Sequence, residues 1–154
     1  MYKRILIATD GSRLSHKAIE EGIALARAQD ASVIGFHARV PVVLPYKPLI
    51  SLPQKTMDLL EKPGLVAARK YLATIEALAK KAGIAFKGVD VVDPYPADSI
   101  IRAARKEKCD LIVMASRGRR GLARLVLGSE TNHVLTHSHI PVLVVTAGPK
   151  GRDG

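Results

Sequence analysis

The hydrophobic pattern at the start of this chain predicts a strand, a helix and a second strand. The run from Arg4 to Ala8 is typical of a buried strand, and the turn from Thr9 to Ser12 ends it. Val33 to Ala38 is a second run of the same kind. Between the two, small and apolar residues recur at helical spacing, at Leu14, Ala18, Gly22, Leu25 and Ala26. Such a unit has parallel strands and, almost always, a right-handed crossover.

The pattern breaks down from Val40 to Pro63, which predicts a long connection. This stretch contains five prolines and shows no sustained periodicity, although Thr56 to Leu60 could add a short helix. Its apolar content is high for a solvated loop, with Val42, Val43, Leu44, Leu49, Ile50 and Leu52. We expect this insertion to act as a lid over a site or to pack on a partner subunit, with packing on its own domain as the alternative.

The second half of the chain predicts three further helices, each with its own boundary signals. The first is stopped by Gly83, in the position of a left-handed C-cap, and its apolar positions are Leu65, Ala68, Leu72, Ile75 and Ala79. Pro94 and Pro96 open the second, which has Asp98 in its first turn and basic residues near its end, as the helix dipole favours. Ser129 is placed to N-cap the third.

Three further strands complete the predicted fold. Phe86 to Val92 alternates apolar and polar residues, which is typical of a strand at the edge of a sheet. Leu111 to Ala115 is wholly apolar, and Pro141 to Thr146 is strongly β-forming. Five strands alternating with four helices predict an α/β fold, a three-layer α/β/α arrangement around an open parallel sheet. Ligands of such sheets bind at the carboxyl ends of the strands.

The length of 154 residues and the composition are those of one compact domain, which we place at residues 1–147, with a flexible tail at 148–154. A hydrophobic content of 47% argues against disorder, and no apolar run approaches the ~20 residues that span a bilayer. The N-terminus enters a strand without a signal-peptide pattern, so we expect a cytoplasmic protein. The single Cys109 cannot form an internal disulfide and is expected in the core.

The stretch from Asp110 to Ser129, DLIVMASRGRRGLARLVLGS, predicts an anion site. A buried strand leads into a loop that contains Gly118, and Gly128 and Ser129 then begin a helix. Glycine lets backbone N–H groups approach a phosphate, and the first N–H groups of a helix lie at the positive end of its dipole. The spacing excludes a Walker A loop, which needs Lys after its last Gly, and the dinucleotide fingerprint G-x-G-x-x-G is absent.

The spacing of this loop, with Ala115 three residues before its first glycine, resembles the nucleotide loop G-x2-G-x9-G-[ST] of the universal stress protein family. Alanine stands in place of the first family glycine, and the resemblance extends from Ile5 to Val145. It implies a Rossmann-like, adenine nucleotide alpha hydrolase-like fold with strand order 3-2-1-4-5, which places the Asp10 turn beside the glycine loop. It also implies ATP binding and a homodimer formed through the last strand, Pro141 to Val145.

By the same resemblance, site residues are expected at the ends of three strands and around the loop. Those expected to bind the nucleotide are Ala8, Thr9, Asp10, Ala38, Met114, Ala115, Arg117, Gly118, Gly128, Ser129 and Glu130. Ala38 corresponds to a backbone contact with adenine, whereas the loop residues surround the ribose and phosphates. Asp10 is the candidate contact for ribose hydroxyls or for the Mg²⁺ that accompanies ATP.

Several features have a second interpretation. Asp10 could equally form an Asx-turn or cap the first helix. His133 and His137 have the i,i+4 spacing of a zinc pair, but no third ligand is evident, and a solvated or interface face is the stronger interpretation. The net charge of +10 and the eight Lys or Arg residues from Arg102 to Arg124 would suit a nucleic acid, but no aromatic residue lies among them for base stacking.

The remaining motifs do not indicate catalysis. The turn after the first strand lacks the glycine pair of the S-G-G-x-D-S loop of adenylating enzymes, and neither Ser129 nor Cys109 has an evident base. We therefore predict an ATP-binding regulatory protein that acts as a dimer, with at most slow ATP hydrolysis. The alternative is a dimeric interaction module of the same fold that binds no nucleotide, and ATP bound to the purified protein would distinguish the two.

Overall fold

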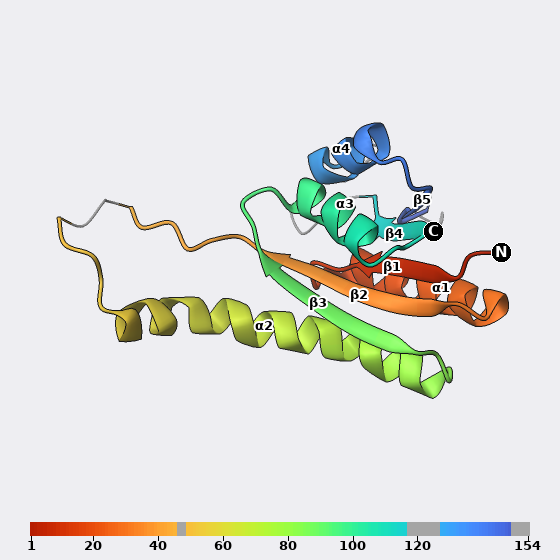
Figure 1. Ribbon diagram of the computed structural model, residues 1–154, viewed down its shortest axis with the longest axis horizontal. Coiled ribbons are helices and arrows are strands. Elements are labelled where there is room, and N and C mark those ends of the chain that lie inside the picture. Colours follow the sequence, from red (N-terminus) through yellow and green to blue (C-terminus); the bar gives the residue numbers. More distant parts are fainter. Residues whose placement is uncertain (46–48, 117–126, 149–154) are drawn as a thin grey trace, which may run out of the picture.

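The computed structural model describes residues 1–45, 49–116 and 127–148. Its elements follow in the order β1 (Arg4–Ala8), α1 (Arg13–Gln29), β2 (Ser32–Arg39), α2 (Gln54–Lys81), β3 (Phe86–Val92), α3 (Pro96–Lys106), β4 (Leu111–Ala115), α4 (Ser129–His137) and β5 (Val142–Val145). The predicted strands and helices are therefore present in the predicted order (Figure 1). No described helix combines the length and the apolar character needed to cross a membrane.

The sheet is parallel throughout, and its order β3-β2-β1-β4-β5 confirms the expected topology. β1 lies in the middle, so Ile7 is paired with Gly35 of β2 on one side and with Val113 of β4 on the other. β3 and β5 form the two edges, and the alternating sequence of β3 fits the prediction of an edge strand. This order brings the carboxyl ends of β1 and β4 together.

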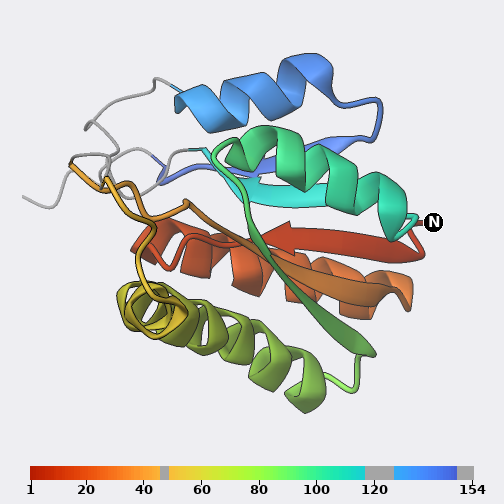
Figure 2. The same cartoon turned by 60° about the vertical axis from the view of Figure 1, so that its left-hand side comes forward.

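Helices cover both faces of the sheet and give the predicted three layers (Figure 2). α1 and α2 pack on one face, where Ile5 and Ile7 of β1 point, and α3 and α4 pack on the other, where Leu6 and Ala8 point. Because helices cover both faces of the sheet, the side chains of β1 are buried on both faces, which explains why its sequence is a continuous hydrophobic run.

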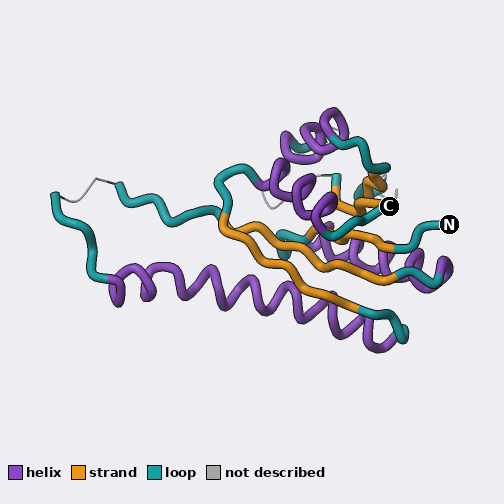
Figure 3. Tube along the Cα trace, in the orientation of Figure 1, coloured by secondary structure: helices purple, strands orange, loops and turns teal. Residues whose placement is uncertain are grey.

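α2 is longer than the sequence predicted. It runs from Gln54 to Lys81, so the expectation of an irregular connection up to Pro63 is wrong for its last ten residues. Pro63 removes one backbone donor and is followed by Gly64, also a poor helix former, but the residues at 59–62 and 67–70 on either side of this pair favour a helix. Its 28 residues span about 42 Å, against about 26 Å for the eight residues of β2. The first turns of α2 therefore project beyond the carboxyl ends of the strands (Figure 3).

The start of α4 lies one residue earlier than expected. Gly128, with φ −61° and ψ 156°, is the N-cap, and Ser129 is the first helical residue, so the prediction that Ser129 caps the helix is wrong. The Gly128 carbonyl accepts the Asn132 N–H at 2.9 Å, and the Gly128 N–H donates to Ser116 O at 2.8 Å. These two bonds fix the helix start at the glycine.

Two other boundaries show how single residues end an element. β5 begins at Val142, one residue after the expected Pro141, because proline has no N–H to donate to the neighbouring strand. Pro141 contributes only its carbonyl, which accepts the Ile112 N–H at 3.0 Å. β5 also ends at Val145, one residue earlier than expected. Gly83 has φ 70° just after α2, which confirms the predicted left-handed position.

Candidate functional site

The carboxyl end of β4 is joined by one hydrogen bond to β5 and by two to the start of α4. Past Ala115, the Ser116 N–H donates to Val145 O at 2.8 Å, which keeps the chain on the sheet. The chain returns at Gly128, whose N–H donates to Ser116 O, and the Thr131 hydroxyl then donates to Ala115 O at 2.9 Å. Thr131 is only 2% exposed, so this last bond is buried. The two ends of the glycine-containing loop therefore meet beside β1.

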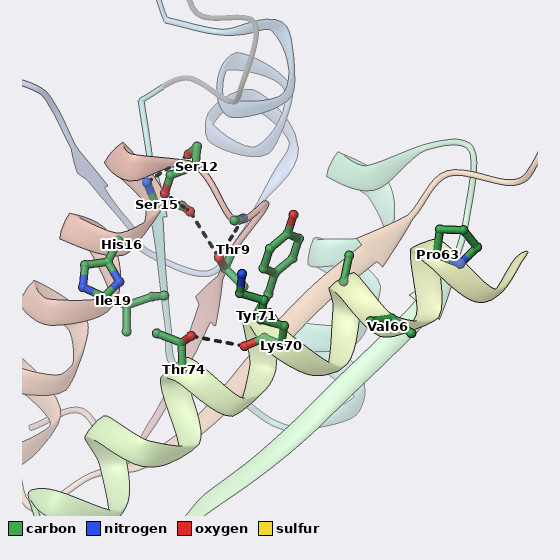
Figure 4. A pocket seen from close by; sticks show the side chains of 12 residues that line it. Thr9, Ser12, Ser15, His16, Ile19, Pro63, Val66, Lys70, Tyr71 and Thr74 are labelled. Atoms are coloured by element: carbon green, nitrogen blue, oxygen red, sulfur yellow. Dashed lines mark hydrogen bonds between the residues drawn. The ribbon is translucent and has the colours of Figure 1, made fainter.

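The turn after β1 is held by its own side chains (Figure 4). Asp10 Oδ1 accepts the Ser12 N–H at 2.9 Å, which confirms the Asx-turn interpretation. Ser12, not Asp10, caps α1, because its hydroxyl accepts the Ser15 N–H at 3.1 Å. The buried Thr9 hydroxyl lies 3.1 Å from Ser15 Oγ and accepts the Gly11 N–H at 3.2 Å. Bonds within the turn and the helix start thus set its conformation.

Two residues that the sequence analysis did not single out, His37 and Tyr71, support this turn from the α2 side. His37 Nδ1 lies 2.8 Å from Thr9 O, and the two rings meet edge-on with centroids 5.2 Å apart. Gly11 has φ 77°, and a Cβ added there would lie 2.2 Å from Tyr71 Cζ, so the ring leaves room only for glycine. His37 carried a signal, as the one ionisable residue in the run Val33 to Ala38, whereas Tyr71 carried none.

Three predicted site residues share one face of the sheet near its carboxyl edge. Ala8 of β1, Ala38 of β2 and Met114 of β4 all belong to the core under α3 and α4. Ala115 faces the core under α1 and α2 instead. Its backbone is extended within β4 and has no positive φ, so alanine replaces the glycine of the resembling motif without backbone strain.

Glu130 and His133 of α4 are engaged by α3. Glu130 Oε2 accepts the Ala97 N–H at 2.8 Å, and His133 Nε2 lies 2.7 Å from Asp98 Oδ1. The His133 ring stacks on that of His137, with centroids 4.0 Å apart. The described residues contain no cluster of three or more metal-ligating side chains, and His133 instead contributes to the contact between the two helices.

Two residues at the amino end of β4 have shifted pKa values. The hydrogen bond from Lys87 holds the pKa of the Glu107 carboxyl below its usual range. Burial raises the pKa of the Cys109 thiol to about 11, so the thiol stays protonated at neutral pH. Cys109 packs in the core under α3 and α4, as predicted, and lies at the opposite end of the sheet from the turn after β1.

The loop itself is only partly described. Arg117 and Gly118, both predicted site residues, lie outside the described residues, as do four of the eight basic residues between Arg102 and Arg124. Ser129 is exposed at the first position of α4. The described part of the candidate site thus consists of the β1 turn, the ends of β2 and β4, and the start of α4.

The chain is similar to known proteins over nearly its whole length. The family model described as the Universal stress protein family matches residues 1–146. Universal stress protein MJ0531 of Methanocaldococcus jannaschii is 34% identical over 150 residues, which cover 94% of this chain and 82% of that protein.

Two solved structures share the fold. Protein MJ0577 of the same organism has a TM-score of 0.81 at 27% identity, with 97% of this chain and 99% of that chain covered. A universal stress protein in complex with cAMP has a TM-score of 0.69 at 26% identity, with 94% of this chain and 97% of that chain covered.

Proposed function

This chain belongs to the universal stress protein family, and we propose that it is an ATP-binding regulatory member that works as a homodimer, with at most slow ATP hydrolysis. The comparison supports an adenine nucleotide, because a relative of the same fold was solved with cAMP. The observation that carries the proposal is the attachment of α4 to β4 through Thr131 and Gly128, which brings a helix N-terminus beside the β1 turn.

The start of α4 is the proposed phosphate site. Gly128 has no side chain that could cap the first N–H groups of α4, whereas Ser12 supplies such a cap to α1. These N–H groups lie at the positive end of the helix dipole, where an anion can accept hydrogen bonds from them. We assign the phosphates to the backbone of Ser129 and Glu130 and to the Ser129 hydroxyl, because the Glu130 carboxylate is bonded to α3.

The remaining contacts follow from the strand ends. We assign the adenine ring to the backbone at the ends of β1, β2 and β4, around Ala8, Ala38 and Met114, because the side chains of these residues pack under α3 and α4. By the family motif we assign the ribose hydroxyls or Mg²⁺ to Asp10, which follows the carboxyl end of β1. Thr9 and Ala115 flank these groups, and the family motif alone assigns Arg117 and Gly118 to the phosphates.

Two potential bases at this edge, His37 and Glu130, make hydrogen bonds within the fold. His37 Nδ1 is bonded to Thr9 O, and the Glu130 carboxylate is bonded to Ala97 N–H. A general base must lie within hydrogen-bond reach of the water that it activates. These bonds leave the second ring nitrogen of His37 and the second oxygen of Glu130 able to accept a proton, so the proposed limit of slow hydrolysis rests on the sequence motifs, in which neither Ser129 nor Cys109 has an evident base.

Mass spectrometry of denatured, freshly purified protein tests nucleotide binding, followed by calorimetry with Mg-ATP, AMP and cAMP. We expect a stoichiometric adenine nucleotide or a calorimetric response to Mg-ATP. An empty protein that also gives no response to any of the three nucleotides would favour the interaction module that binds none.

The glycine at the start of α4 provides the matched variant. Gly128→Val should leave the fold intact, because φ −61° and ψ 156° suit valine, but its branched side chain should block the phosphates and abolish ATP binding. Gly88→Val in β3 is the control, since a Cβ there makes only ordinary contacts of 3.6 Å. Unchanged ATP affinity in a folded Gly128→Val protein would remove α4 from the proposed site.

The proposed homodimer forms through β5. This strand is an edge of the sheet, its sequence VLVV carries no charge, and Leu143 is 38% exposed. An edge strand presents backbone N–H and C=O groups that can pair with another chain. Pairing of β5 with the same strand of a second copy around a two-fold axis would satisfy both edges.

A further inference from the structure

A groove of about 550 Å³ lies between α1 and α2. Figure 4 shows His16 and Ile19 of α1 on one side, Val66 and Lys70 of α2 on the other, and Thr9 between them. The volume falls within the roughly 300–1,000 Å³ typical of small-molecule sites. The groove is therefore large enough for a ligand with one or two rings.

The groove is separate from the proposed adenine contacts. Its helices cover the face of the sheet where Ile5 and Ile7 point, whereas Ala8, Ala38 and Met114 belong to the opposite face. The two places share only the turn after β1, which contributes Thr9, Gly11 and Ser12 to the groove. A molecule in the groove would thus lie behind the turn, not at the start of α4.

In the described part of the chain, the groove is lined by one cationic side chain and by no carboxylate. Its lining contains Lys70 and His16 but no Asp or Glu. No carboxylate of the described residues lies within 4 Å of Lys70 Nζ, and the nearest acidic partner of His16 is Glu20, outside the lining, at 3.6 Å. An anion bound in the groove would compensate the charge of Lys70.

The rest of the lining is apolar or carries hydroxyl groups. Ile19 and Ala67 face the groove from the two helices, and Val66 and Pro63 extend the apolar wall towards the projecting part of α2. Val66 is 55% exposed, so a ligand could remove apolar surface from water there. Ser12 and Thr74 add hydroxyl groups at the two sides.

We propose that this groove is a second ligand site, which binds a small organic anion with a compact aromatic or cyclic body. The acidic group, a carboxylate or sulfonate, lies near Lys70, and the ring lies against Val66 and Ala67. Both parts are needed, because a ligand with only one of them would leave either the charges or the apolar wall without a partner.

The test uses the full-length protein and the fluorescent probe anilinonaphthalene sulfonate (ANS). We expect saturable binding of one ANS per chain, displaced by naphthalene sulfonate at least fivefold more effectively than by uncharged naphthol. Excess Mg-ATP should leave the ANS signal in place, since the groove is separate from the start of α4. ANS binding does not depend on whether the chain binds ATP, so the test stands if the nucleotide proposal fails.

Paired variants place the probe in the groove. Lys70→Glu should weaken ANS binding about tenfold and remove the preference for naphthalene sulfonate, whereas Lys55→Glu makes the same charge change about 22 Å further along α2 and should have little effect. Ala67→Trp should fill the groove and abolish binding, whereas Ala77→Trp, at an exposed position of α2, should not. Circular dichroism and the Tm of each variant show that it is folded.

Three results would overturn the inference. Displacement of ANS by Mg-ATP would make the groove part of the nucleotide site. Equal ANS affinity in folded Lys70→Glu or Ala67→Trp and their controls would place the probe elsewhere on the surface. Absence of saturable binding would show that the groove accepts no ligand of this class.

Discussion

The buried hydrogen bond from Thr131 to Ala115 O makes the role of α4 testable with a single atom change. Thr131→Val replaces the hydroxyl with a methyl group of similar size, so the core keeps its volume while the 2.9 Å bond is lost. A buried carbonyl without its partner costs about 1–3 kcal/mol. If the free energy of unfolding falls by about 2 kcal/mol, the Tm of a chain of this size should fall by about 4–8 °C.

The same bond also sets the position of the proposed phosphate site, so ATP affinity should change as well. Loss of one well-placed hydrogen bond to a charged phosphate costs roughly 1.5 kcal/mol, which corresponds to about tenfold in Kd. Thermal unfolding measures the stability, and isothermal calorimetry with Mg-ATP measures the affinity. Thr131→Ser should restore both, because serine keeps the donor.

The control is Thr136→Val on the same helix, where the exposed hydroxyl donates to Asn132 O at 2.9 Å. Water can replace that bond, so Thr136→Val should change stability by less than about 0.5 kcal/mol. The reasoning is refuted if Thr131→Val is no less stable than Thr136→Val. If Thr131→Val loses stability but binds ATP as tightly as the wild type, the bond is structural and the start of α4 does not hold the phosphates.

Three further predictions concern the β1 turn and the dimer. Asp10→Asn should keep the Asx-turn and the Tm but weaken Mg-ATP binding in calorimetry, whereas Asp10→Ala should also lower the free energy of unfolding by about 1 kcal/mol. If Asp10→Asn binds Mg-ATP like the wild type, the carboxylate serves only the turn. Gly11→Ala should lower the free energy of unfolding by about 1–3 kcal/mol because of the φ of 77°, and by more because of the clash with the Tyr71 ring. Measured by urea unfolding, the loss should be smaller in a Tyr71→Ala background, and equal losses in the two backgrounds would contradict the contact. Leu143→Lys should sediment as a monomer, whereas the control Leu60→Lys should remain a dimer, although the Leu60 side chain is similarly exposed at 40%. A dimeric Leu143→Lys protein or a monomeric wild type would exclude β5 as the interface.

The sequence by itself determined the elements whose patterns are local. The strand and helix of the first βαβ unit could be predicted because continuous apolar runs and helical spacing depend only on which faces become buried. Gly83 could be placed for the same reason, since a left-handed residue after a helix is a local backbone requirement. The strand order followed from the resemblance to the universal stress protein family, and the sheet confirmed it.

Only the structure revealed the continuation of α2 through Pro63, and tertiary structure decided the contacts between distant segments. A proline followed by a glycine indicates a break, but the structure shows that α2 continues through Pro63 and Gly64 to the helix-forming residues beyond them. Tyr71 reaches Gly11, and the Glu130 carboxylate reaches Ala97 N–H, only because the sheet order brings their elements together. Periodicity records whether a position is buried, not which residue covers it, so the partner of each site residue depends on the assembled layers.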